Sequence, residues 1–589
     1  MEEKQLVVLA TSDLHGDIYS FSYESNEANE SQGCARVQSY FDEVRQEFPD
    51  AILLDNGDTF QGTIMTDAIY SKDLSKPHPV AKWMNFAKYD CMTLGNHEFN
   101  FGLDFIKTIA SQVNFPILAA NVEYKDVDPS GQAKHFLSPY TILERDGIKI
   151  GVLGITNPNI PRWDGAKVEE LNFLNIPDTA EKYVKILREK EQVDLLIASV
   201  HADWEPEFDF EHGSDGAESI LRRVDGIDIL ILGHQHIRIA KKVNGTMVGM
   251  PVNSGRQVLR YDILMGKNNV SGKWKAKNID LQVVEMSNYD ASEKVRELIK
   301  EGHERTVAFI QGTSEGENGG VFAYATENFQ PPNEIKDIPL GKLQDTPLIE
   351  LIAQVQLAAT GADVTSVSLL KDSSDIRKGE INFGGLFDIY RYNNTLCTVE
   401  ISGSELKTYM EWAVRIFNTW RKGDISISFS ESIPAHLYDM FKGVEYEINL
   451  SENPGNRIQN VRYKGEPLKD DENLLLAVCD YRYNSGLKVH KLVSHSANCE
   501  SSQKIRDMIG DYLKAKGTIS PTISRNWKIV GVNLEHPLRG EIIQLVNSGY
   551  LEVPYYHSLN VYELEASGII KNGKIERPAN KVKARKFEH

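Results

Sequence analysis

The first half of the chain repeats one pattern, an apolar β-branched run that ends in polar residues. The runs are LVVLATSD (6–13), AILLDNGD (51–58), MTLGNHE (92–98), VDLLIASVH (193–201) and IDILILGHQH (227–236). Helical patterns such as AEKYVKILREKE (180–191) separate them. Continuous apolar runs of this kind are typical of parallel strands covered by helices on both faces, so we predict an α/β domain. Functional sites of such sheets gather at the carboxyl ends of the strands, where all five runs carry their polar residues.

The pattern changes after residue 310. SEKVRELIKEGHERTVAFI (292–310) predicts one long helix, and the breaker-rich segments SEGENGG (314–320) and QPPNEIKDIP (330–339) follow it. The segment DTPLIELIAQVQLAAT (345–360) predicts a helix. Strand patterns and turns then alternate, for example in TLCTVEISGSEL (395–406) and VEYEINLSENPGNRIQNVRY (444–463). The second half is therefore predicted to form an α+β domain.

These changes predict the domain organisation, and the length of 589 residues fits two large domains. We expect a catalytic domain at 1–313 that includes the helix at about 292–310, a linker at 314–339, a second domain at 340–530 and a C-terminal extension at 531–589. The extension is interpreted as a packing element, with a partner-docking segment as the alternative.

Composition excludes some functions. Apolar residues make up 41% of the chain and charged residues 25%, as in ordinary soluble globular proteins. The formal net charge of -19 disfavours binding to polymeric nucleic acid, which requires a basic surface. Small anionic substrates remain compatible with this charge if metal ions supply positive charge locally. No window reaches the ~18 apolar residues that a membrane-spanning helix needs, so no membrane partner is expected.

The cysteines and the N-terminus predict a compartment. Cys34, Cys91, Cys397, Cys479 and Cys499 are odd in number, scattered and without CxxC spacing. This pattern argues against a disulfide framework or a thiolate zinc site and favours reduced thiols. The start, MEEKQLVVLATSDLHG, lacks the basic region and cleavage site of a signal peptide. We therefore expect a cytoplasmic protein, with a processed exported protein as the alternative.

The strand-end residues together have the composition of a site for two divalent metal ions. The candidate ligands are Asp13, His15, Asp58, Asn96, His201, His234 and His236. Carboxylate, imidazole and amide oxygen suit zinc, manganese, iron or cobalt, and the absence of thiolate argues against a structural zinc. A lone histidine is more often a surface or core residue than a ligand, but these histidines and aspartates recur at the ends of successive strands. Glycines 57, 95 and 233 directly precede candidate ligands and would permit tight turns and close backbone approach there.

Two metal ions would serve the hydrolysis of phosphate esters. Placed roughly 3.5–4 Å apart, they ionise a bridging water and clamp the phosphate, so that hydroxide attacks phosphorus. Asp58 is the candidate for the carboxylate shared by both ions. Asn96 adds a neutral ligand that does not repel an anionic substrate. His97 is better placed at the leaving group, as general acid or as a hydrogen-bond donor to the transition state.

The motifs that contain these residues resemble those of a known family. The motifs D-x-H (13–15), GDTFQG (57–62), GNHE (95–98), the lone His201 and GHQH (233–236) are similar to those of calcineurin-like metallophosphoesterases. More narrowly, residues from about 5 to 530 resemble the 5′-nucleotidase / 2′,3′-cyclic-nucleotide 2′-phosphodiesterase (3′-nucleotidase) family. The resemblance implies an N-terminal αββα sandwich followed by an α+β substrate-binding domain.

The resemblance also implies roles for individual residues. One metal ion would be held by Asp13, His15, Asp58 and His236. The other would be held by Asp58, Asn96, His201 and His234. His97 would be catalytic and Asn100 would orient it.

Asn100 points to one branch of the family. Family members with 5′-nucleotidase activity usually read GNHEFD, whereas this chain reads GNHEFN (95–100), as is usual in the 2′,3′-cyclic-nucleotide branch. The segments LLDNGDTFQGT (53–63) and YRYNNTL (390–396) also agree with that branch. An asparagine can orient an imidazole through its carbonyl but does not stabilise imidazolium as a carboxylate does.

The same resemblance implies a nucleobase site in the second domain. Tyr392 and Tyr481 match the two aromatic positions that sandwich a base, which contribute roughly 1–3 kcal/mol per base, and Asn394 could add a polar contact. The alternative for each tyrosine is a half-buried packing residue. Two segments depart from the family pattern, NSGLKVHK (484–491) and LLKDSSDIRKGE (369–380), which leaves recognition of base and sugar open.

The sequence thus predicts a dinuclear-metal phosphohydrolase that acts on small nucleotides, as a 2′,3′-cyclic-nucleotide 2′-phosphodiesterase and 3′-nucleotidase. A 5′-nucleotidase or another organophosphate hydrolase is the first alternative. A catalytically silent nucleotide-binding protein is the alternative from another class. The sequence decides neither metal identity, base preference nor oligomeric state.

Overall fold

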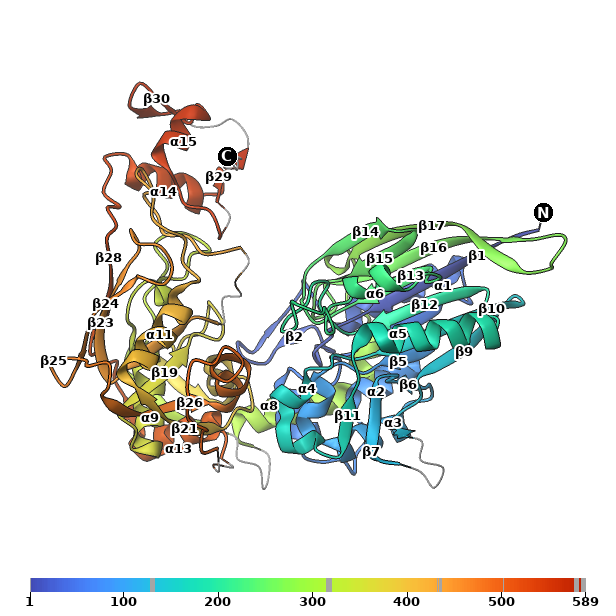
Figure 1. Cartoon of the computed structure of the whole chain (residues 1–589), viewed down its shortest axis with the longest axis horizontal. Coiled ribbons are helices and arrows are strands. Elements are labelled where there is room, and N and C mark those ends of the chain that lie inside the picture. The colour runs from blue at the N-terminus through green and yellow to red at the C-terminus, as the bar shows by residue number, and fades with distance from the viewer. Residues whose placement is uncertain are drawn as a thin grey trace. The chain divides into compact units, whose positions relative to one another are not determined.

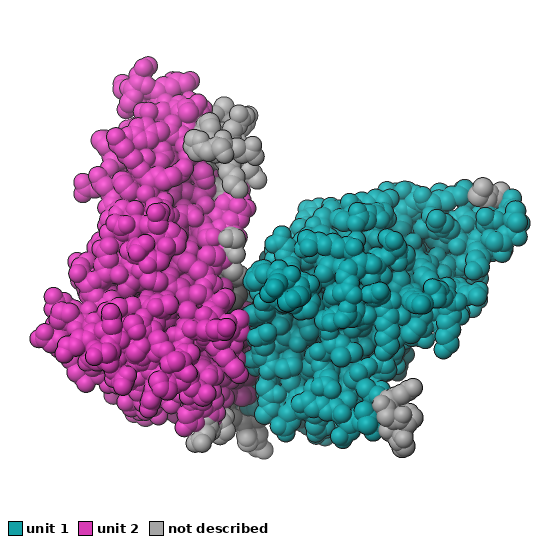
Figure 2. All heavy atoms as spheres, in the orientation of Figure 1, with its two compact units in different colours: residues 1–317 teal, residues 318–589 magenta. Residues whose placement is uncertain are grey.

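The structure, a computed structural model, describes residues 2–127, 133–313, 320–431, 433, 437–499, 501, 503–553, 555–576 and 582–583. The chain forms two compact units, Met1–Glu317 and Asn318–His589 (Figure 2).

Unit 1 is built on two six-stranded sheets (Figure 1). The first has the order β17-β16-β1-β4-β5-β6, in which β1, β4, β5 and β6 are parallel. Its strands are β17 (Trp274–Glu285), β16 (Gln257–Lys267), β1 (Glu3–Thr11), β4 (Ile52–Asp55), β5 (Cys91–Thr93) and β6 (Ile117–Leu118). The second has the order β14-β15-β13-β12-β10-β9, with the four central strands parallel and the two edge strands antiparallel. Its strands are β14 (Ile239–Val243), β15 (Thr246–Met250), β13 (Ile229–Leu232), β12 (Leu195–Val200), β10 (Ile148–Ile155) and β9 (Tyr140–Arg145).

The two sheets pack face to face with helices outside. Along β1, Val8 belongs to the core between the sheets, while Val7 and Leu9 belong to the core under the helices, because successive side chains of a strand point to opposite faces. The first sheet is covered by α1 (Cys34–Glu47), α2 (Pro79–Ala87) and α3 (Leu103–Gln112). The second is covered by α5 (Ile176–Lys185) and α6 (Glu218–Arg223). The implied αββα sandwich is confirmed.

The more general prediction of helices on both faces of one sheet is wrong. Each sheet of unit 1 has helices on one face and the other sheet on its second face. An apolar strand is buried on both faces in either arrangement, so its hydrophobic pattern does not reveal which layer covers it.

The predicted long helix at 292–310 is also wrong in one respect. The structure has two helices there, α7 (Glu293–Leu298) and α8 (Lys300–Gln311). The backbone of Ile299 leaves the helical region, with φ -112° and ψ 12°, and its side chain is buried. The helix therefore breaks at a residue with a buried side chain. The segments before and after it have the same helical periodicity, so the sequence pattern did not reveal the break.

Unit 2 is α+β. One four-stranded sheet has the order β21-β26-β19-β22, and a three-stranded sheet has the order β20-β18-β27. A second four-stranded sheet has the order β25-β24-β23-β28, with β25 (Glu466–Pro467), β24 (Ile458–Tyr463), β23 (Val444–Asn449) and β28 (Trp527–Val530). The strands of the first sheet are β21 (Leu396–Ser402), β26 (Asn473–Cys479), β19 (Val364–Ser368) and β22 (Asp439–Lys442). The helix predicted from 345 is present as α9 (Pro347–Thr360). The range predicted as a linker contains β18 (Val321–Ala325), which pairs with β20 (Gly379–Asn382) and β27 (Thr518–Ile519) and so belongs to this unit.

The C-terminal extension packs on unit 2. It contains α14 (Arg539–Asn547) and α15 (Val561–Ala566). The Ile425 N–H donates to the Leu559 carbonyl at 2.8 Å, and the Tyr555 ring stacks on Phe429 with ring centroids 4.3 Å apart. These contacts fit the interpretation of a packing element.

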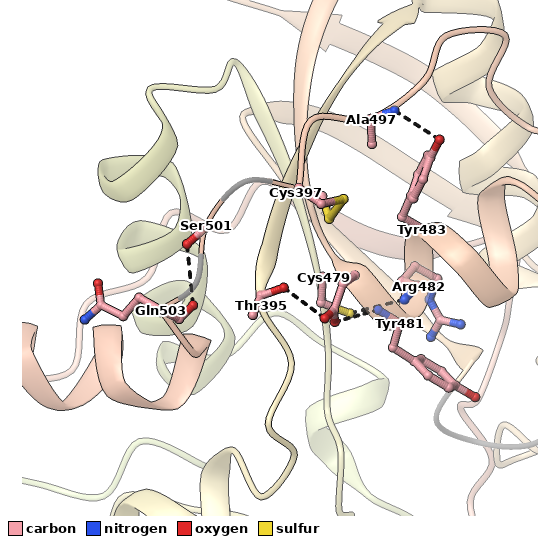
Figure 3. The surroundings of a disulfide bond; sticks show 11 residues. Thr395, Cys397, Cys479, Tyr481, Arg482, Tyr483, Ala497, Ser501 and Gln503 are labelled. Atoms are coloured by element: carbon pink, nitrogen blue, oxygen red, sulfur yellow. Dashed lines mark hydrogen bonds between the residues drawn. A yellow bond between two sulfur atoms is a disulfide. The ribbon is translucent and has the colours of Figure 1, made fainter. Parts of the chain in front are cut away.

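The prediction of reduced cysteines is wrong for one pair. Cys397 and Cys499 form a disulfide with a Cα–Cα distance of 4.2 Å (Figure 3). The two cysteines are 102 residues apart in sequence, and two backbone hydrogen bonds between Thr398 and Asn498, both 2.8 Å, hold their segments side by side. Only the pairing of these distant segments creates the juxtaposition, so cysteine spacing gave no signal. No helix in the described part of the chain is long and apolar enough to cross a membrane.

Candidate metal centre

The predicted ligands follow strands of both sheets of unit 1. The first sheet supplies Asp13 and His15 after β1, Asp58 after β4 and Asn96 after β5. The second supplies His201 after β12, and His234 and His236 after β13. The structure gathers six of these seven into two groups whose ligand atoms lie within 4.8 Å of one another, Asp13 with His15 and His236, and Asp58 with His201 and His234.

The backbone is strained where these side chains converge. The φ angles are 54° at Asp13, 49° at His15, 54° at Asp58, 76° at His234 and 58° at His236. Residues other than glycine rarely adopt this left-handed region, and such conformations persist where the surrounding structure enforces them.

Glycines let the ligand loops approach each other. A Cβ on Gly95 would lie 2.2 Å from Asp58 Oδ1, and a Cβ on Gly57 would lie 2.2 Å from the Gly95 nitrogen. A Cβ on Gly233 would lie 2.2 Å from Ser12 Oγ. The close approach expected at these glycines is confirmed.

The first group presents imidazole and carboxylate to one point. His15 Nε2 and His236 Nε2 are 3.0 Å apart, and His236 Nε2 is 3.2 Å from Asp13 Oδ1. The other ring nitrogen of His15, Nδ1, lies 3.1 Å from the Gln61 carbonyl, which as an acceptor favours a proton on Nδ1. Nε2 then carries the lone pair that a cation requires.

The second group is built in the same way. His201 Nδ1 donates to the Asn56 carbonyl at 2.6 Å, and its Nε2 lies 3.0 Å from Asp58 Oδ2. Asn96 Oδ1 is buried, and none of the described residues donates a hydrogen bond to it. An unpaired buried carbonyl oxygen is costly, so this atom suits a cation ligand.

The charges of the pocket favour a cation. Burial lowers the pKa of His201, but Asp58 and Asp13 outweigh burial and raise it to about 9. Burial likewise opposes charging of His234, but Glu207 and Asp203 raise its pKa to about 10. The carboxylates therefore create a negative potential that stabilises positive charge between the two sheets.

Sequence reasoning missed a third donor group. Asp203, Glu207 and His234 also present ligand atoms within 4.8 Å of one another, and Glu207 Oε2 lies 3.3 Å from His234 Nε2. Burial raises the pKa of Asp203 to about 6. Both acids follow His201 in the same loop, which is the signal that could have drawn attention to them.

Glu98 was also missed, although its motif was noted. The buried Glu98 carboxylate accepts four backbone N–H groups, from Asp58 at 2.9 Å, Thr59 at 2.7 Å, Phe60 at 3.1 Å and Gly95 at 2.8 Å. It therefore ties the loop that carries Asp58 to the loop that carries Asn96.

His97 lies beside the first group. Its ring is edge-on to His15 with centroids 5.3 Å apart, and its backbone N–H donates to Asp58 Oδ1 at 2.7 Å. His97 Nδ1 is 2.8 Å from Asn100 Oδ1, so Asn100 is in place to orient it. The Asn100 amide group donates in turn to the Asp164 carboxylate, at 3.2 and 3.1 Å.

The residues predicted to bind the base lie in unit 2. Tyr392 is 36% exposed and Tyr481 is half-buried in α12 (Asp480–Arg482). Tyr392 precedes β21 and Tyr481 follows β26, at the end of this antiparallel pair where Leu396 is opposite Cys479. The Asp480 N–H donates to the Thr395 carbonyl at 3.0 Å, and Thr395 Oγ1 donates to Asp480 Oδ2 at 2.9 Å, so the two segments are joined. Burial raises the pKa of Tyr390, and the nearby Asn394 side chain opposes this shift.

Comparison with known families fits this architecture. Residues 6–238 match the model of the calcineurin-like phosphoesterases, and residues 326–493 match the model of the 5′-nucleotidase C-terminal domain. The chain is a calcineurin-like phosphoesterase with a 5′-nucleotidase C-terminal domain. It is therefore a phosphoric ester hydrolase by family, and calcineurin-like phosphoesterases use divalent metals.

Relatives extend over both units. The chain is 26% identical to the 2′,3′-cyclic-nucleotide 2′-phosphodiesterase/3′-nucleotidase of Yersinia enterocolitica, over 90% of this chain and 89% of that protein. It is also 26% identical to the trifunctional nucleotide phosphoesterase protein YfkN of Bacillus subtilis, over 90% of this chain, but spans 39% of that protein's length. The 5′-nucleotidase precursor of Thermus thermophilus has the same fold, with a TM-score of 0.63 at 20% identity, over 90% of this chain and all of that one.

The donor set of this calcineurin-like phosphoesterase fits divalent metal ions. Facing ring nitrogens, carboxylates and the unpaired Asn96 oxygen are the ligand types that zinc, manganese, iron and cobalt accept. The individual roles of the seven candidate ligands stay predictions.

Proposed function

We propose that the protein hydrolyses 2′,3′-cyclic nucleotides to 3′-nucleotides, and 3′-nucleotides to nucleosides, with two divalent ions bound in the two donor groups. The observation that carries the proposal is that His97, oriented by Asn100, lies beside these two groups. The GNHEFN motif with Asn100 resembles the cyclic-nucleotide branch, and relatives named for that activity align over 90% of the chain.

Each group of the centre has a proposed part. Divalent ions supply Lewis acidity and an activated water nucleophile when bound. Asp13, His15 and His236 would hold one ion, and Asn96, His201 and His234 the other, with Asp58 shared. His97 Nε2 would donate a proton to the ribose oxygen that leaves, while Nδ1 keeps its hydrogen bond to Asn100. Manganese, zinc, iron and cobalt all suit these donors, so the identity of the ions stays open.

Tyr392 and Tyr481 are proposed to stack on the base. Their placement at one end of the β21–β26 pair allows both rings to face one ligand. Asn394, two residues after Tyr392, is proposed to add a polar contact to the nucleotide.

Alanine at Tyr392 or Tyr481 is expected to raise KM for 3′-AMP about 5- to 100-fold, because stacking contributes about 1–3 kcal/mol per base. KM for p-nitrophenyl phosphate, which has no base, is expected to change by less than about twofold. Tyr324→Ala, on the separate strand β18, is a control because this tyrosine is 46% exposed. Equal changes in KM for both substrates would contradict stacking.

A substrate panel tests the proposed reaction. Metal-loaded protein is expected to turn over 2′,3′-cyclic AMP and 3′-AMP faster than 5′-AMP, and EDTA treatment is expected to remove all three activities. A preference for 5′-AMP would instead support the first alternative, a 5′-nucleotidase. No turnover of any ester by protein with two bound ions would support a silent nucleotide-binding protein.

The compartment stays a prediction. The disulfide between Cys397 and Cys499 supports the exported alternative over the cytoplasmic one, because structural disulfides are rare in reducing compartments.

A further inference from the structure

The Asn100 side chain connects His97 to a carboxylate that lies far away in the sequence. Its Oδ1 faces His97 Nδ1 at 2.8 Å, and its Nδ2 donates to both carboxylate oxygens of Asp164, at 3.2 and 3.1 Å. His97 and Asn100 belong to the turn η2 (His97–Phe101), whereas Asp164 ends the helix α4 (Ile160–Asp164). The Asp164 side chain is only 2% exposed.

An amide group alone has no preferred orientation at such a position. The oxygen and nitrogen of asparagine are nearly the same size, and an isolated Asn100 could present either atom to His97. An ionised carboxylate can only accept hydrogen bonds, so Asp164 requires the NH₂ group of Asn100 on its own side. The Asn100 oxygen is then turned toward His97.

The orientation of Asn100 decides which nitrogen of His97 carries its proton. Because Asn100 Oδ1 can only accept, His97 Nδ1 must donate, and Nε2 is the nitrogen left to serve the substrate. With the amide reversed, the Asn100 NH₂ group would face Nδ1 and favour the proton on Nε2 in the neutral ring. The hydrogen bonds that connect Asp164, Asn100 and His97 therefore have one donor-to-acceptor arrangement.

We propose that Asp164 is a positioning residue for the reaction, which fixes the orientation of Asn100 and, through it, the tautomer and ring orientation of His97. This inference rests on the proposed function. In this step His97 enters with a proton on each ring nitrogen. As an oxygen from water bonds to phosphorus and the phosphorus–oxygen ester bond breaks, the electron pair of that bond stays on the ester oxygen, which takes the Nε2 proton and leaves the His97 ring neutral. The Nδ1 proton remains on the ring, held by Asn100. Asp164 acts on His97 through Asn100.

A second partner of Asp164 provides a matched control. Lys167 Nζ donates to Asp164 Oδ1 at 2.9 Å, and the Lys167 side chain is 46% exposed. Lys167→Gln removes this ion pair but leaves the contact between Asp164 and Asn100. Because the Lys167 side chain is largely solvated and its loss leaves the Asp164–Asn100 hydrogen bonds in place, kcat is expected to stay within about twofold of wild type.

The test compares two leaving groups and exchanges two side chains. Asp164→Asn is expected to lower kcat for 3′-AMP about tenfold with little change in KM, as loss of an outer hydrogen-bond partner does. kcat for p-nitrophenyl phosphate should change by less than about twofold, because its leaving group is a stable anion that needs no proton. The metal content per chain and Tm are expected to match those of wild type.

The exchanged pair separates orientation from simple loss of contact. Asn100→Asp alone would place two carboxylates against each other and is expected to lower kcat for 3′-AMP more than Asp164→Asn does. The double variant Asn100→Asp/Asp164→Asn restores a donor facing an acceptor at both contacts. Its kcat is expected to return to within about threefold of wild type.

Three results would overturn the inference. They are wild-type kcat for 3′-AMP in Asp164→Asn, an equal loss of kcat for both esters, and no recovery in the double variant. If wild-type protein hydrolyses neither ester, the proposed function is wrong and the inference with it. Normal p-nitrophenyl phosphate turnover with wild-type 3′-AMP kcat in Asp164→Asn would overturn the inference alone.

Discussion

Asp58→Asn is expected to lower kcat/KM for every phosphate ester about 10³-fold or more, because it removes the one carboxylate that both donor groups would share. Asparagine has nearly the same shape as aspartate, but the surrounding hydrogen bonds determine how its amide group is oriented. Asp58 Oδ1 accepts the His97 backbone N–H at 2.7 Å, so the asparagine oxygen will take that position. The new NH₂ group will then face His201 Nε2, where Asp58 Oδ2 now lies at 3.0 Å.

Metal content shows whether this loss arises from the centre. Protein reconstituted with manganese or zinc and freed of excess metal is expected to bind about two ions per chain as wild type and at most about one as Asp58→Asn. Asp262→Asn is the control, since Asp262 pairs with Arg260 on β16 of the same sheet. Wild-type metal content together with wild-type kcat/KM in Asp58→Asn would refute the bridging role.

Glu98→Gln is expected to destabilise unit 1 by about 3 kcal/mol, because one carboxylate oxygen that accepts two backbone N–H groups is replaced by a donor. The charge itself is held at a cost, since burial and the nearby Asp58 raise the pKa of Glu98, while the backbone N–H groups oppose this shift. With glutamine, an NH₂ group would face backbone N–H groups for which no other described residue is the acceptor.

The measurement is urea unfolding of the full chain, with the transition of unit 1 followed by metal release. Glu98→Gln should also weaken metal binding by about 10–100-fold, because the loops of Asp58 and Asn96 lose their common anchor. Glu293→Gln, at a side chain that is 80% exposed, should change neither property. Unchanged stability and metal affinity in Glu98→Gln would show that the loops hold their positions without this carboxylate.

Much of the site could be predicted because its residues follow apolar strands. Polar residues that directly follow a parallel strand lie at the carboxyl edge of its sheet. This rule predicted that residues from five separate segments lie close together. The six residues that the structure places in the two donor groups were all among the candidates. Local patterns were sufficient here because each ligand is positioned by its own strand.

The features that were missed depend on contacts between distant segments. Asp164 reaches Asn100 across 64 positions of sequence, and Cys397 meets Cys499 across 102. Glu98 lies inside a noted motif, but its role depends on two loops that fold against it. A local pattern of residue types does not show which distant segments come into contact.

The sequence alone indicated five strands of unit 1, the edge at which the candidate ligands gather and the residue types that form the two donor groups. Hydrophobic periodicity and strand-end polarity are local properties, so they can be read along the chain. Tertiary structure decided that two sheets face each other, that a disulfide joins β21 to the segment after Tyr481, and that a carboxylate stands behind Asn100. These outcomes follow from which buried surfaces pack together, and packing is a property of the whole chain.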